Sequence, residues 1–316
     1  MKLLSILLLS YNNLNEVYVT LDSIFCQDYP SLELILSDDA SWDFTEQQPR
    51  VAAYIEEHRP ENLQKVIWVS HAENGGTVKN MNDAIRASHG EYLFSFSPED
   101  VLSHEKALSH LVQALEESGR DIVFGRMRGV MPDGTFVDYL QSCESNYTLL
   151  KSYTVEQTRN RLFSRNFLPA PAKLMTRKLF EENGLYPECI RLIEDYPYWL
   201  TLTKNGVPFT YLDEVVLIYR LNSSGGGYYS EAFMNDMFEI YNLFIFPYDH
   251  RFGPMQGVYN CLKRQGLEFY QARAKWSKLS ASKKRWLRFK YLPFFLYTEL
   301  LNWKIMRKNR ITDSIT

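Results

Sequence analysis

Three short polar clusters could hold a ligand together. Residues 10–12 (SYN), 37–39 (SDD) and 97–100 (SPED) each follow a short apolar segment. Carboxylate oxygens are the ligands that hard divalent cations prefer, and such cations bind phosphates. The ring of Tyr11 offers a flat face to a planar ligand. Any one cluster of Asn, Asp and Ser could be an ordinary turn, so a ligand site is indicated only where the three lie together.

A second group of acids, Glu194 and Asp195, directly precedes a segment with helical periodicity at residues 196–205. A carboxylate beside a hydroxyl group can accept its proton during nucleophilic attack. The alternative is structural, because the helix dipole favours acidic side chains in a first helical turn. Tyr198 and Trp199 follow, and they fit either a ligand-stacking role or the core.

The N-terminal third alternates between strand and helix patterns. Short apolar segments predict strands at residues 3–9, 32–36, 65–69 and 92–96, and helical spacing predicts helices at 15–27, 49–58 and 78–88. This alternation indicates a mainly parallel, doubly wound α/β sheet. Ligands bind beyond the carboxyl ends of the strands in such sheets. All three polar clusters follow predicted strands, so we expect a shared ligand site at one edge.

The pattern becomes less regular after residue 100. We expect a helix at residues 104–118, a strand at 121–125, a hairpin at 129–137, a strand followed by a helix at 173–183, and a late strand at 215–220. A Ser/Gly-rich loop at 222–227 indicates a hinge or a domain boundary. We therefore expect two domains, residues 1–222 and 223–316, the second helical and basic.

The composition is that of a globular chain. Of its 316 residues 45% are hydrophobic and 23% charged, which excludes the disordered and fibrous classes. Four cysteines lie far apart without a CxxC pair, so we expect reduced thiols rather than a disulfide framework or a zinc site. The N-terminal MKLLSILLLS is similar to a signal peptide, but no small-residue cleavage site follows, which favours a buried first strand. We expect no transmembrane helix, because none of the apolar segments approaches about 20 residues.

Basic residues are concentrated near the C-terminus. Residues 273–310 carry twelve lysines and arginines and one acid, although the net charge of the whole chain is −3. Interleaved aromatic residues and leucines are typical of a helix lying in a membrane interface. A helical addition that packs on the N-terminal domain, on a second subunit or on a protein partner explains the same composition, so both interpretations stay open. No nucleic-acid motif accompanies the charge, and we expect no nucleic-acid partner.

The ordered motifs resemble the family 2 glycosyltransferases. The matching segments are residues 10–12 (SYN), 38–43 (DDASWD), 74–93 (NGGTVKNMNDAIRASHGEYL), 97–100 (SPED) and 194–200 (EDYPYWL). Together they cover residues 1 to about 220. The resemblance implies a GT-A fold with a Rossmann-like sheet, extended here by a C-terminal helical addition. It also implies an inverting transfer of a sugar from a nucleotide-sugar donor.

The resemblance implies donor-binding roles at the strand ends. Ser10 would be a donor-binding residue, the ring of Tyr11 would lie against the base, and Asp39 would accept a hydrogen bond from the imide N–H of the base, which favours UDP over GDP. Lys79 would reach a phosphate, and Arg220, ahead of a glycine-rich lid, would bind the pyrophosphate. Structural roles compete with these, since Asp39 fits an Asx-turn and Lys79 a solvated helix surface.

The expected metal site departs from the family pattern. The family holds Mn²⁺ or Mg²⁺ with an Asp-x-Asp element, and Ser97 stands where its leading Asp is expected. By position, Asp100 would be the principal metal ligand, and Glu99 a ribose or metal contact. A histidine common in the family is Asn222 here. The structural alternative is a helix cap at Ser97 or Asp100.

Catalysis and partners follow from the same resemblance. Asp195 would be the catalytic base, and Glu194 would orient the acceptor. We expect a metal-dependent transfer of a hexose (galactose, glucose or an N-acetylhexosamine) from a UDP-sugar to a glycan on a lipid carrier or surface protein. This reaction would serve bacterial surface-polysaccharide or glycoprotein synthesis in the cytoplasm, either free or at the inner face of the plasma membrane.

Two other function classes compete with glycosyl transfer. Ser97 keeps open a nucleotide-sugar or glycan-binding relative without turnover, because it replaces an expected metal ligand. A dinucleotide-dependent oxidoreductase is disfavoured, because no GxGxxG follows the first predicted strand.

Overall fold

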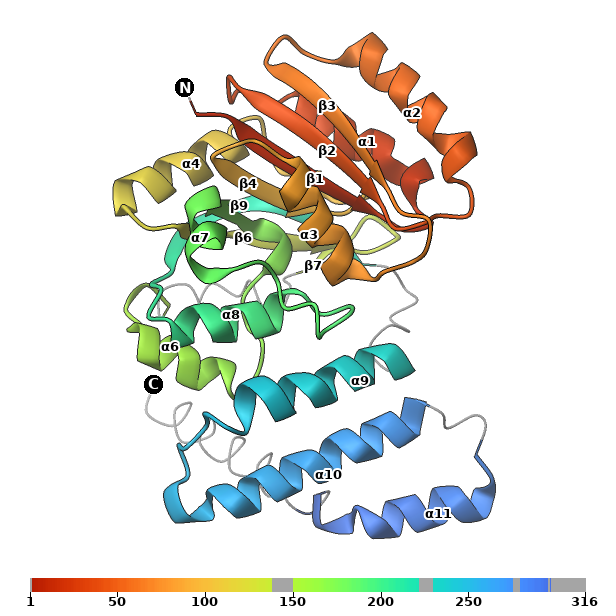
Figure 1. The fold of residues 1–316 in the computed structure, drawn as a ribbon, viewed down its shortest axis with the longest axis vertical. Helices are drawn as coiled ribbons and strands as arrows, with labels where there is room; N and C mark the ends of the chain where they lie inside the picture. The colour runs from red at the N-terminus through yellow and green to blue at the C-terminus, as the bar shows by residue number, and fades with distance from the viewer. Residues whose placement is uncertain (1, 138–149, 222–229, 275–278, 295, 297–316) are drawn as a thin grey trace. The chain divides into compact units, whose positions relative to one another are not determined.

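The computed structural model describes residues 2–137, 150–221, 230–274, 279–294 and 296 (Figure 1). The chain divides into two compact units, residues 1–225 and 226–316, which are described separately. The predicted boundary after residue 222 falls outside the described residues and stays a prediction.

The first unit is built on a mixed sheet with the strand order β3-β2-β1-β4-β8-β6-β9-β5, and β7 pairs with β6 (Figure 1). The strands are β1 (Leu4–Ser10), β2 (Leu32–Asp38), β3 (Leu63–Ser70), β4 (Tyr92–Phe96), β5 (Val101–Leu102), β6 (Ile122–Val130), β7 (Phe136–Val137), β8 (Lys173–Thr176) and β9 (Thr210–Arg220).

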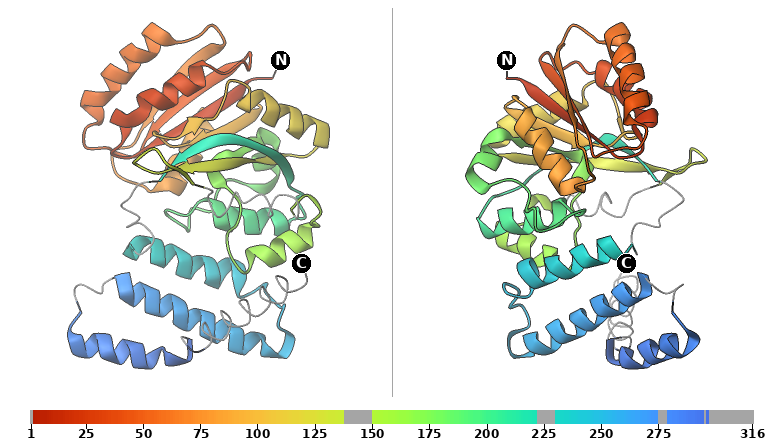
Figure 2. Two further views of the ribbon diagram at one scale, coloured as in Figure 1. Left: turned by 180° about the vertical axis from the view of Figure 1, so that it is seen from behind. Right: turned by 45° about the vertical axis from the view of Figure 1, so that its right-hand side comes forward.

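Helices connect these strands. They are η1 (Leu14–Glu16), α1 (Val17–Phe25), α2 (Phe44–His58), α3 (Thr77–Ala87), α4 (Ala107–Ser118), α6 (Val155–Leu162), η2 (Ala170–Ala172), α7 (Arg177–Asn183) and α8 (Asp195–Lys204). Figure 1 shows α3 and α7 in front of the sheet, and Figure 2 shows α1 and α2 in front when the molecule is seen from behind.

The parallel half of the sheet contains the four predicted strands. β1 pairs in parallel with β2 and β4, and β2 pairs in parallel with β3. Ser10 lies opposite Asp38, and Leu8 lies opposite Phe96. This register brings the ends of β1, β2 and β4, with the polar clusters that follow them, to one edge. The α/β fold class expected from the sequence is confirmed.

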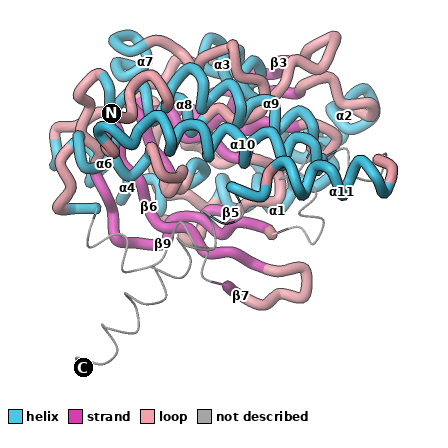
Figure 3. The backbone as a smooth tube through the Cα atoms, turned by 90° about the horizontal axis from the view of Figure 1, so that it is seen from below, coloured by secondary structure: helices cyan, strands magenta, loops and turns pink. Residues whose placement is uncertain are grey.

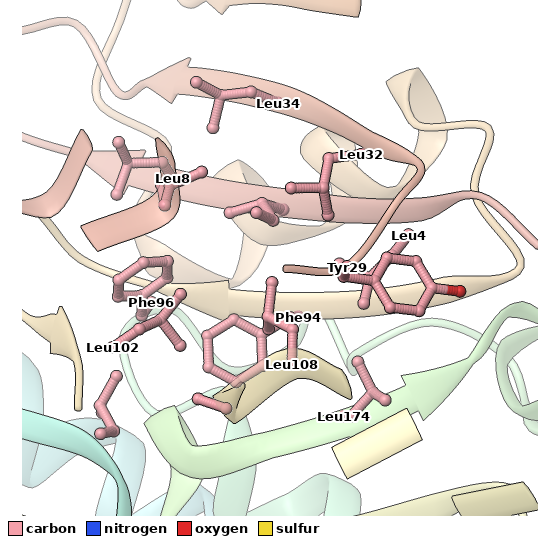
Figure 4. Close-up of a cluster of buried hydrophobic side chains, with 14 of the residues drawn as sticks. Leu4, Leu8, Tyr29, Leu32, Leu34, Phe94, Phe96, Leu102, Leu108 and Leu174 are labelled. Carbon is pink, nitrogen blue, oxygen red and sulfur yellow. The ribbon is translucent and has the colours of Figure 1, made fainter. Parts of the chain in front are cut away.

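Burial explains why the N-terminal apolar segment is a strand. Alternate β1 residues, Leu4, Ile6 and Leu8, belong to the main hydrophobic cluster with side chains of α1, α2 and α4. Figure 4 shows Leu8, Phe94 and Leu108 in this cluster. The opposite face of β1 and β2 contacts α3. A strand covered on both faces is apolar almost throughout, and β1 satisfies this because its residues other than Ser5 and Ser10 are leucine or isoleucine.

The other half of the sheet differs from a simple parallel arrangement. β8 pairs antiparallel with both β4 and β6, and β5 pairs antiparallel with β9, whereas β6 and β9 are parallel. Figure 3 shows β6 and β9 side by side. Strand direction depends on how the chain returns to the sheet, and the four residues of β8 (KLMT) carry no signal for it. The predicted hairpin is present, because Gly129 pairs with Val137.

Helix α2 begins earlier than expected. The sequence predicts a helix starting at Pro49, since proline favours the first turn. The structure begins the helix at Phe44 and includes Pro49 in its interior. Proline lacks the N–H group that would donate to the carbonyl of Thr45, so one bond of this helix is missing.

The second unit consists of helices in its described part. They are α9 (Glu231–Ile240), the π-helical turn η4 (Tyr241–Ile245), η5 (Gly253–Met255), α10 (Gln256–Ala274) and α11 (Ala281–Lys290). Helix α10 contacts α9. A small core of Phe269 from α10 with Leu287 and Tyr291 joins α10 to α11.

Candidate functional site

A cavity of about 470 Å³ lies at the carboxyl ends of β1, β2 and β4. Residues from both halves of the first unit line it, from the strand ends on one side and from the segments around β8 and α8 on the other. Its charged lining residues are Asp39, Asp100, Lys173, Glu194 and Asp195. Ser10 and Tyr11 also line it, so the structure brings together six of the nine residues predicted for the site.

The three loops at this edge share an unusual backbone. Among the described residues, the non-glycine residues with positive φ are Asn12, Ala40 and Glu99, one in each predicted polar cluster or directly after it. Left-handed backbone is costly for most side chains and is concentrated at functional sites. The coincidence with the cavity therefore supports a ligand site at this edge.

Asp38 stabilises the loop after β2. Its Oδ2 accepts hydrogen bonds from the hydroxyls of Ser10 (2.7 Å) and Ser41 (2.6 Å), and its Oδ1 accepts from the backbone N–H of Ser41 (2.8 Å). Ser10 therefore has a structural partner as well as a position in the cavity lining.

Asp39 fixes the loop that leads into α3. Its two carboxylate oxygens accept hydrogen bonds from the backbone N–H groups of Gly75 and Gly76, each at 2.8 Å, and His71 Nδ1 lies 3.0 Å from Oδ1. A carboxylate has about four acceptor positions, so capacity for one further donor remains. The Asx-type structural role and the predicted contact with a base are therefore compatible. Tyr11 is 52% exposed, which leaves a ring face accessible.

Asp100 is the buried acid at the end of β4. Only 4% of the residue is exposed, and Oδ1 accepts a hydrogen bond from the backbone N–H of Arg220 at 3.2 Å. Burial raises the pKa of Asp100 to about 7, despite the backbone N–H groups that favour the carboxylate. A nearby cation would favour the ionised form, so this residue fits a divalent metal that is also bound by phosphates.

Glu99 and Ser97 differ from Asp100 in burial. Ser97 is exposed, and Glu99 is half-buried with φ +81°. Neither Glu99 nor Asp100 belongs to a three-residue ligand group of the described chain. The group of that kind is His104, His110 and Glu214, which lies outside the cavity lining.

Lys79 and Arg220 do not line the cavity in this structure. The ammonium of Lys79 pairs with Asp83 one turn further along α3, and it is half exposed. Arg220 ends β9, and its guanidinium lies 3.8 Å from the carboxylate of Glu16. Their proposed phosphate contacts stay predictions, because both side chains would have to change partners.

Glu194 and Asp195 open α8 and face the cavity. Asp195 Oδ2 accepts a hydrogen bond from the side-chain amide of Asn166 at 2.5 Å. Burial raises the pKa of Asp195, and burial together with the charge of Asp195 raises the pKa of Glu194 to about 7. A carboxylate with a raised pKa is a stronger base, so the arrangement suits proton transfer near neutral pH.

Tyr198 and Trp199 belong to the core. Both side chains are buried, and Trp199 packs edge-to-face against Phe124 with ring centroids 5.2 Å apart. Of the two interpretations left open by the sequence, the structure supports packing rather than ligand stacking.

Lys173 is not among the residues predicted for the site from the sequence. This residue begins β8, is 1% exposed and lines the cavity beside the acids of α8. A signal was present in the sequence, since a lysine stands within the otherwise apolar segment APAKLM. The neighbours that make it notable lie about 80 residues upstream and 20 downstream, and only the fold brings them together.

Comparison with known proteins decides the family. Residues 5–184 match the family described as glycosyl transferase family 2. The chain belongs to this family. Family membership agrees with the resemblance seen in the motifs and with the position of the cavity.

The chain spans only part of the length of the curated relatives that it matches. The uncharacterized glycosyltransferase EpsJ of Bacillus subtilis is 29% identical over 222 residues, which is 70% of this chain and 61% of EpsJ. A poly(ribitol-phosphate) beta-glucosyltransferase of Bacillus spizizenii is 24% identical over 84% of this chain and 37% of its own length.

Solved structures share the fold. S. aureus TarS (residues 1–349) in complex with UDP-GlcNAc has a TM-score of 0.59 and 19% identity, covering 93% of this chain and 89% of that one. The mannosyltransferase PcManGT from Pyrobaculum calidifontis, in complex with GDP-Man and Mn²⁺, has a TM-score of 0.60 and 17% identity, covering 96% and 85%. The GT-A fold expected from the sequence is confirmed by these neighbours.

Membrane spanning is not a feature of the described helices. None of them combines the length and apolarity that crossing a bilayer requires.

Proposed function

We propose that this protein is an inverting, metal-dependent glycosyltransferase that transfers a hexose from a UDP-sugar to a hydroxyl group of a glycan. The observation that carries the proposal is the single cavity in which Tyr11, Asp39 and Asp100 on the strand ends face Glu194 and Asp195 at the start of α8. One side has the groups for a nucleotide diphosphate, and the other has a base for the acceptor.

The donor side is proposed to hold uridine and the diphosphate. The ring of Tyr11 would stack on the base, beside Ser10, and the remaining acceptor capacity of Asp39 suits the imide N–H of uracil. Lys79 and Arg220 would exchange their present carboxylate partners for phosphate oxygens. The UDP-GlcNAc and GDP-Man complexes of TarS and PcManGT support a nucleotide-sugar donor, and the choice of uridine rests on Asp39.

Asp100 is the proposed principal ligand of Mn²⁺ or Mg²⁺, with Glu99 as a second contact to the metal or ribose. When bound, the cation would neutralise negative charge on the departing diphosphate. The burial of Asp100 supports this role, because a carboxylate kept out of water is stabilised by a positive charge.

Asp195 is the proposed base. The acceptor hydroxyl oxygen forms a bond to the anomeric carbon while the bond from that carbon to the diphosphate oxygen breaks, so configuration inverts and UDP leaves. The hydroxyl proton passes to Asp195, whose other contacts are the amide of Asn166 and the α8 N-terminus. Glu194 lines the same wall and would orient the acceptor.

The acceptor is proposed to be a glycan on a lipid carrier or a surface protein, in bacterial surface-polysaccharide or glycoprotein synthesis on the cytoplasmic side. Support comes from a relative that is named as a poly(ribitol-phosphate) beta-glucosyltransferase. Contact with the inner face of the plasma membrane is part of this proposal, because α11 carries five basic and no acidic residues.

The proposal predicts donor-dependent release of UDP. Purified protein with Mn²⁺ and each of UDP-Glc, UDP-Gal, UDP-GlcNAc and UDP-GalNAc should release UDP from at least one of them, and chelation with EDTA should abolish it. Asp195→Asn should retain UDP affinity within about twofold but lose 10²-fold or more in rate, since an amide cannot accept the proton.

The alternative is a nucleotide-sugar or glycan-binding relative without turnover, which Ser97 favours because it replaces an expected metal ligand. This alternative is correct if wild type and Asp195→Asn both bind UDP while neither turns over any donor with or without a glycan acceptor.

A further inference from the structure

Lys173 is a buried cation whose position folding alone does not explain. It begins β8, where Phe124 of β6 lies beside it, and 1% of the residue is exposed. Transfer of an ammonium group from water to a protein interior is costly unless it is paired. A leucine or methionine would fill the same place in the sheet without that cost, so the charge needs a separate reason.

The hydrogen bonds of Lys173 involve neutral groups. Nζ donates to Ser95 Oγ (3.1 Å) and to the carbonyl of Ala170 (2.6 Å), and the ring centroid of Trp199 lies 5.9 Å away. An ammonium has three N–H groups, so these two acceptors do not use its full capacity. Lys173 also lines the cavity, where its third N–H group can donate a further hydrogen bond.

The charged groups around Lys173 are acids. Among the described residues that line the cavity, it is the one basic side chain, against Glu194, Asp195, Asp39 and Asp100. Burial lowers the pKa of Lys173, while the two acids of α8 act in the opposite direction and favour the ammonium form. The same lysine favours the ionised forms of Glu194 and Asp195.

Two neutral groups from neighbouring loops also act on the acid pair. The pair also faces the neutral amide of Asn166 and the phenol of Tyr186, whose pKa burial and both acids raise. Two adjacent carboxylates in one buried wall disfavour each other's ionisation, so the positive charge of Lys173 in the same cavity lining shifts their balance toward the ionised forms.

We propose that Lys173 is a positioning residue that supplies the counter-charge for Glu194 and Asp195 and favours their ionised forms, so that Asp195 can take the proton of the acceptor. This inference rests on the proposed role of Asp195 as base. It adds a residue from β8 to the cavity wall formed by α8. It also explains why a lysine begins β8, in which two apolar residues and a terminal threonine follow.

Two substitutions separate charge from packing. Lys173→Gln keeps a donor for Ser95 and Ala170 but carries no charge, and Lys173→Met keeps only the shape. Lys178→Met is the matched control, because Lys178 is exposed on α7 and pairs with Asp121 outside the cavity. With Mn²⁺ and the active UDP-sugar, both Lys173 variants should shift the acidic limb of the pH–rate profile upward by about one unit or more, a tenfold loss of rate on that limb. UDP affinity should change less than threefold.

A second measurement does not need turnover. Infrared titration of the protonated carboxyl band, assigned by its loss in Glu194→Gln and Asp195→Asn, should show the acid pair ionising at higher pH in Lys173→Gln than in wild type. An unchanged carboxyl titration overturns the proposal. So does a large loss of UDP affinity with an unshifted pH profile, because Lys173 would then contact the donor diphosphate.

The two proposals can fail separately. If wild type releases no UDP but the carboxyl titration shifts as expected, the counter-charge is correct and glycosyl transfer is wrong. If UDP release is normal and neither the profile nor the titration moves in Lys173→Met, Lys173 is a structural residue. If one of the two Lys173 variants does not fold, the measurements are made on the other, since Gln and Met fill the site differently.

Discussion

Asp39 illustrates how one residue can have a structural and a binding role. Three of its acceptor positions are used by Gly75, Gly76 and His71, which fixes the loop before α3. His71 also lies 3.1 Å from Asp83 through Nε2, so the loop is joined to α3 by side chains as well as by backbone. The position of Asp39 after an apolar strand could be predicted from the sequence. The glycines that it binds could not, because they lie 36 and 37 positions further along the chain.

Glu194 makes stability depend on pH, and the direction follows from its raised pKa. Its ordinary pKa is 4.5 and its pKa in the folded protein is about 7. The folded state therefore holds the proton more tightly, and this contribution to stability is present below pH 4.5 and is lost as the pH rises to about 7. Glu194→Gln stays neutral and should lose less stability over this interval.

Thermal unfolding of wild type and Glu194→Gln between pH 5 and 8 measures this difference. The melting temperature of the variant should fall less steeply, and the two should differ most at pH 8. Glu91→Gln on the exposed surface provides the control, and its curve should follow that of wild type. Parallel curves for Glu194→Gln would show that Glu194 is not protonated preferentially in the folded state.

At the scale of elements, the sequence predicted the parallel half of the sheet well because its signals are local. Each strand is a short apolar run and each helix has its own periodicity, as in β4, which was predicted with the bounds observed. The antiparallel insertion of β8 and the early start of α2 were missed. Pairing direction is set by contacts between distant segments, and Pro49 is tolerated because Val51 and Ile55 anchor α2 to the core.

Helix α3 begins after Gly76, where the backbone conformation and the neighbouring atoms disfavour any other residue. Gly76 precedes α3 with φ +91°, and a Cβ at this position would lie 2.4 Å from Arg191 Cγ and 2.6 Å from its carbonyl oxygen. Its N–H also donates to Asp39. Gly76→Ala should therefore destabilise the fold by about 2 kcal/mol or more, since backbone strain and a steric clash add. It should also weaken UDP binding.

Gly134→Ala isolates the backbone contribution. Gly134 has a similar φ of +84°, but a Cβ there would meet nothing within 4 Å. Denaturant unfolding should show a loss of about 1 kcal/mol for Gly134→Ala, with UDP affinity unchanged. Equal losses for the two variants would mean that the contact with Arg191 does not constrain Gly76.

At the scale of the whole molecule, the charge is divided along the chain. The net charge is −3, yet α11 has the sequence ASKKRWLRFK and is strongly basic. This helix also has two apolar faces. Leu287 and Tyr291 are buried against α10, whereas Trp286, Phe289 and Leu292 are 51%, 76% and 46% exposed. An exposed aromatic face bordered by lysines and arginines matches an anionic membrane interface.

The proposed membrane contact predicts binding to anionic vesicles through this face. In co-sedimentation, wild type should bind phosphatidylglycerol-containing vesicles and release them as salt rises, because the lysines and arginines act over a short screening distance. Trp286→Ser combined with Phe289→Ser should reduce binding at least tenfold, since each partly inserted ring contributes on the order of 1 kcal/mol. Met255→Ser with Val258→Ser is the matched control, because both residues are exposed in the same unit and lie outside α11. Equal binding by both double variants contradicts the assignment of this face. If wild type and the control double variant are dimers while the Trp286→Ser, Phe289→Ser variant is a monomer, the packing interpretation of the basic segment is supported instead.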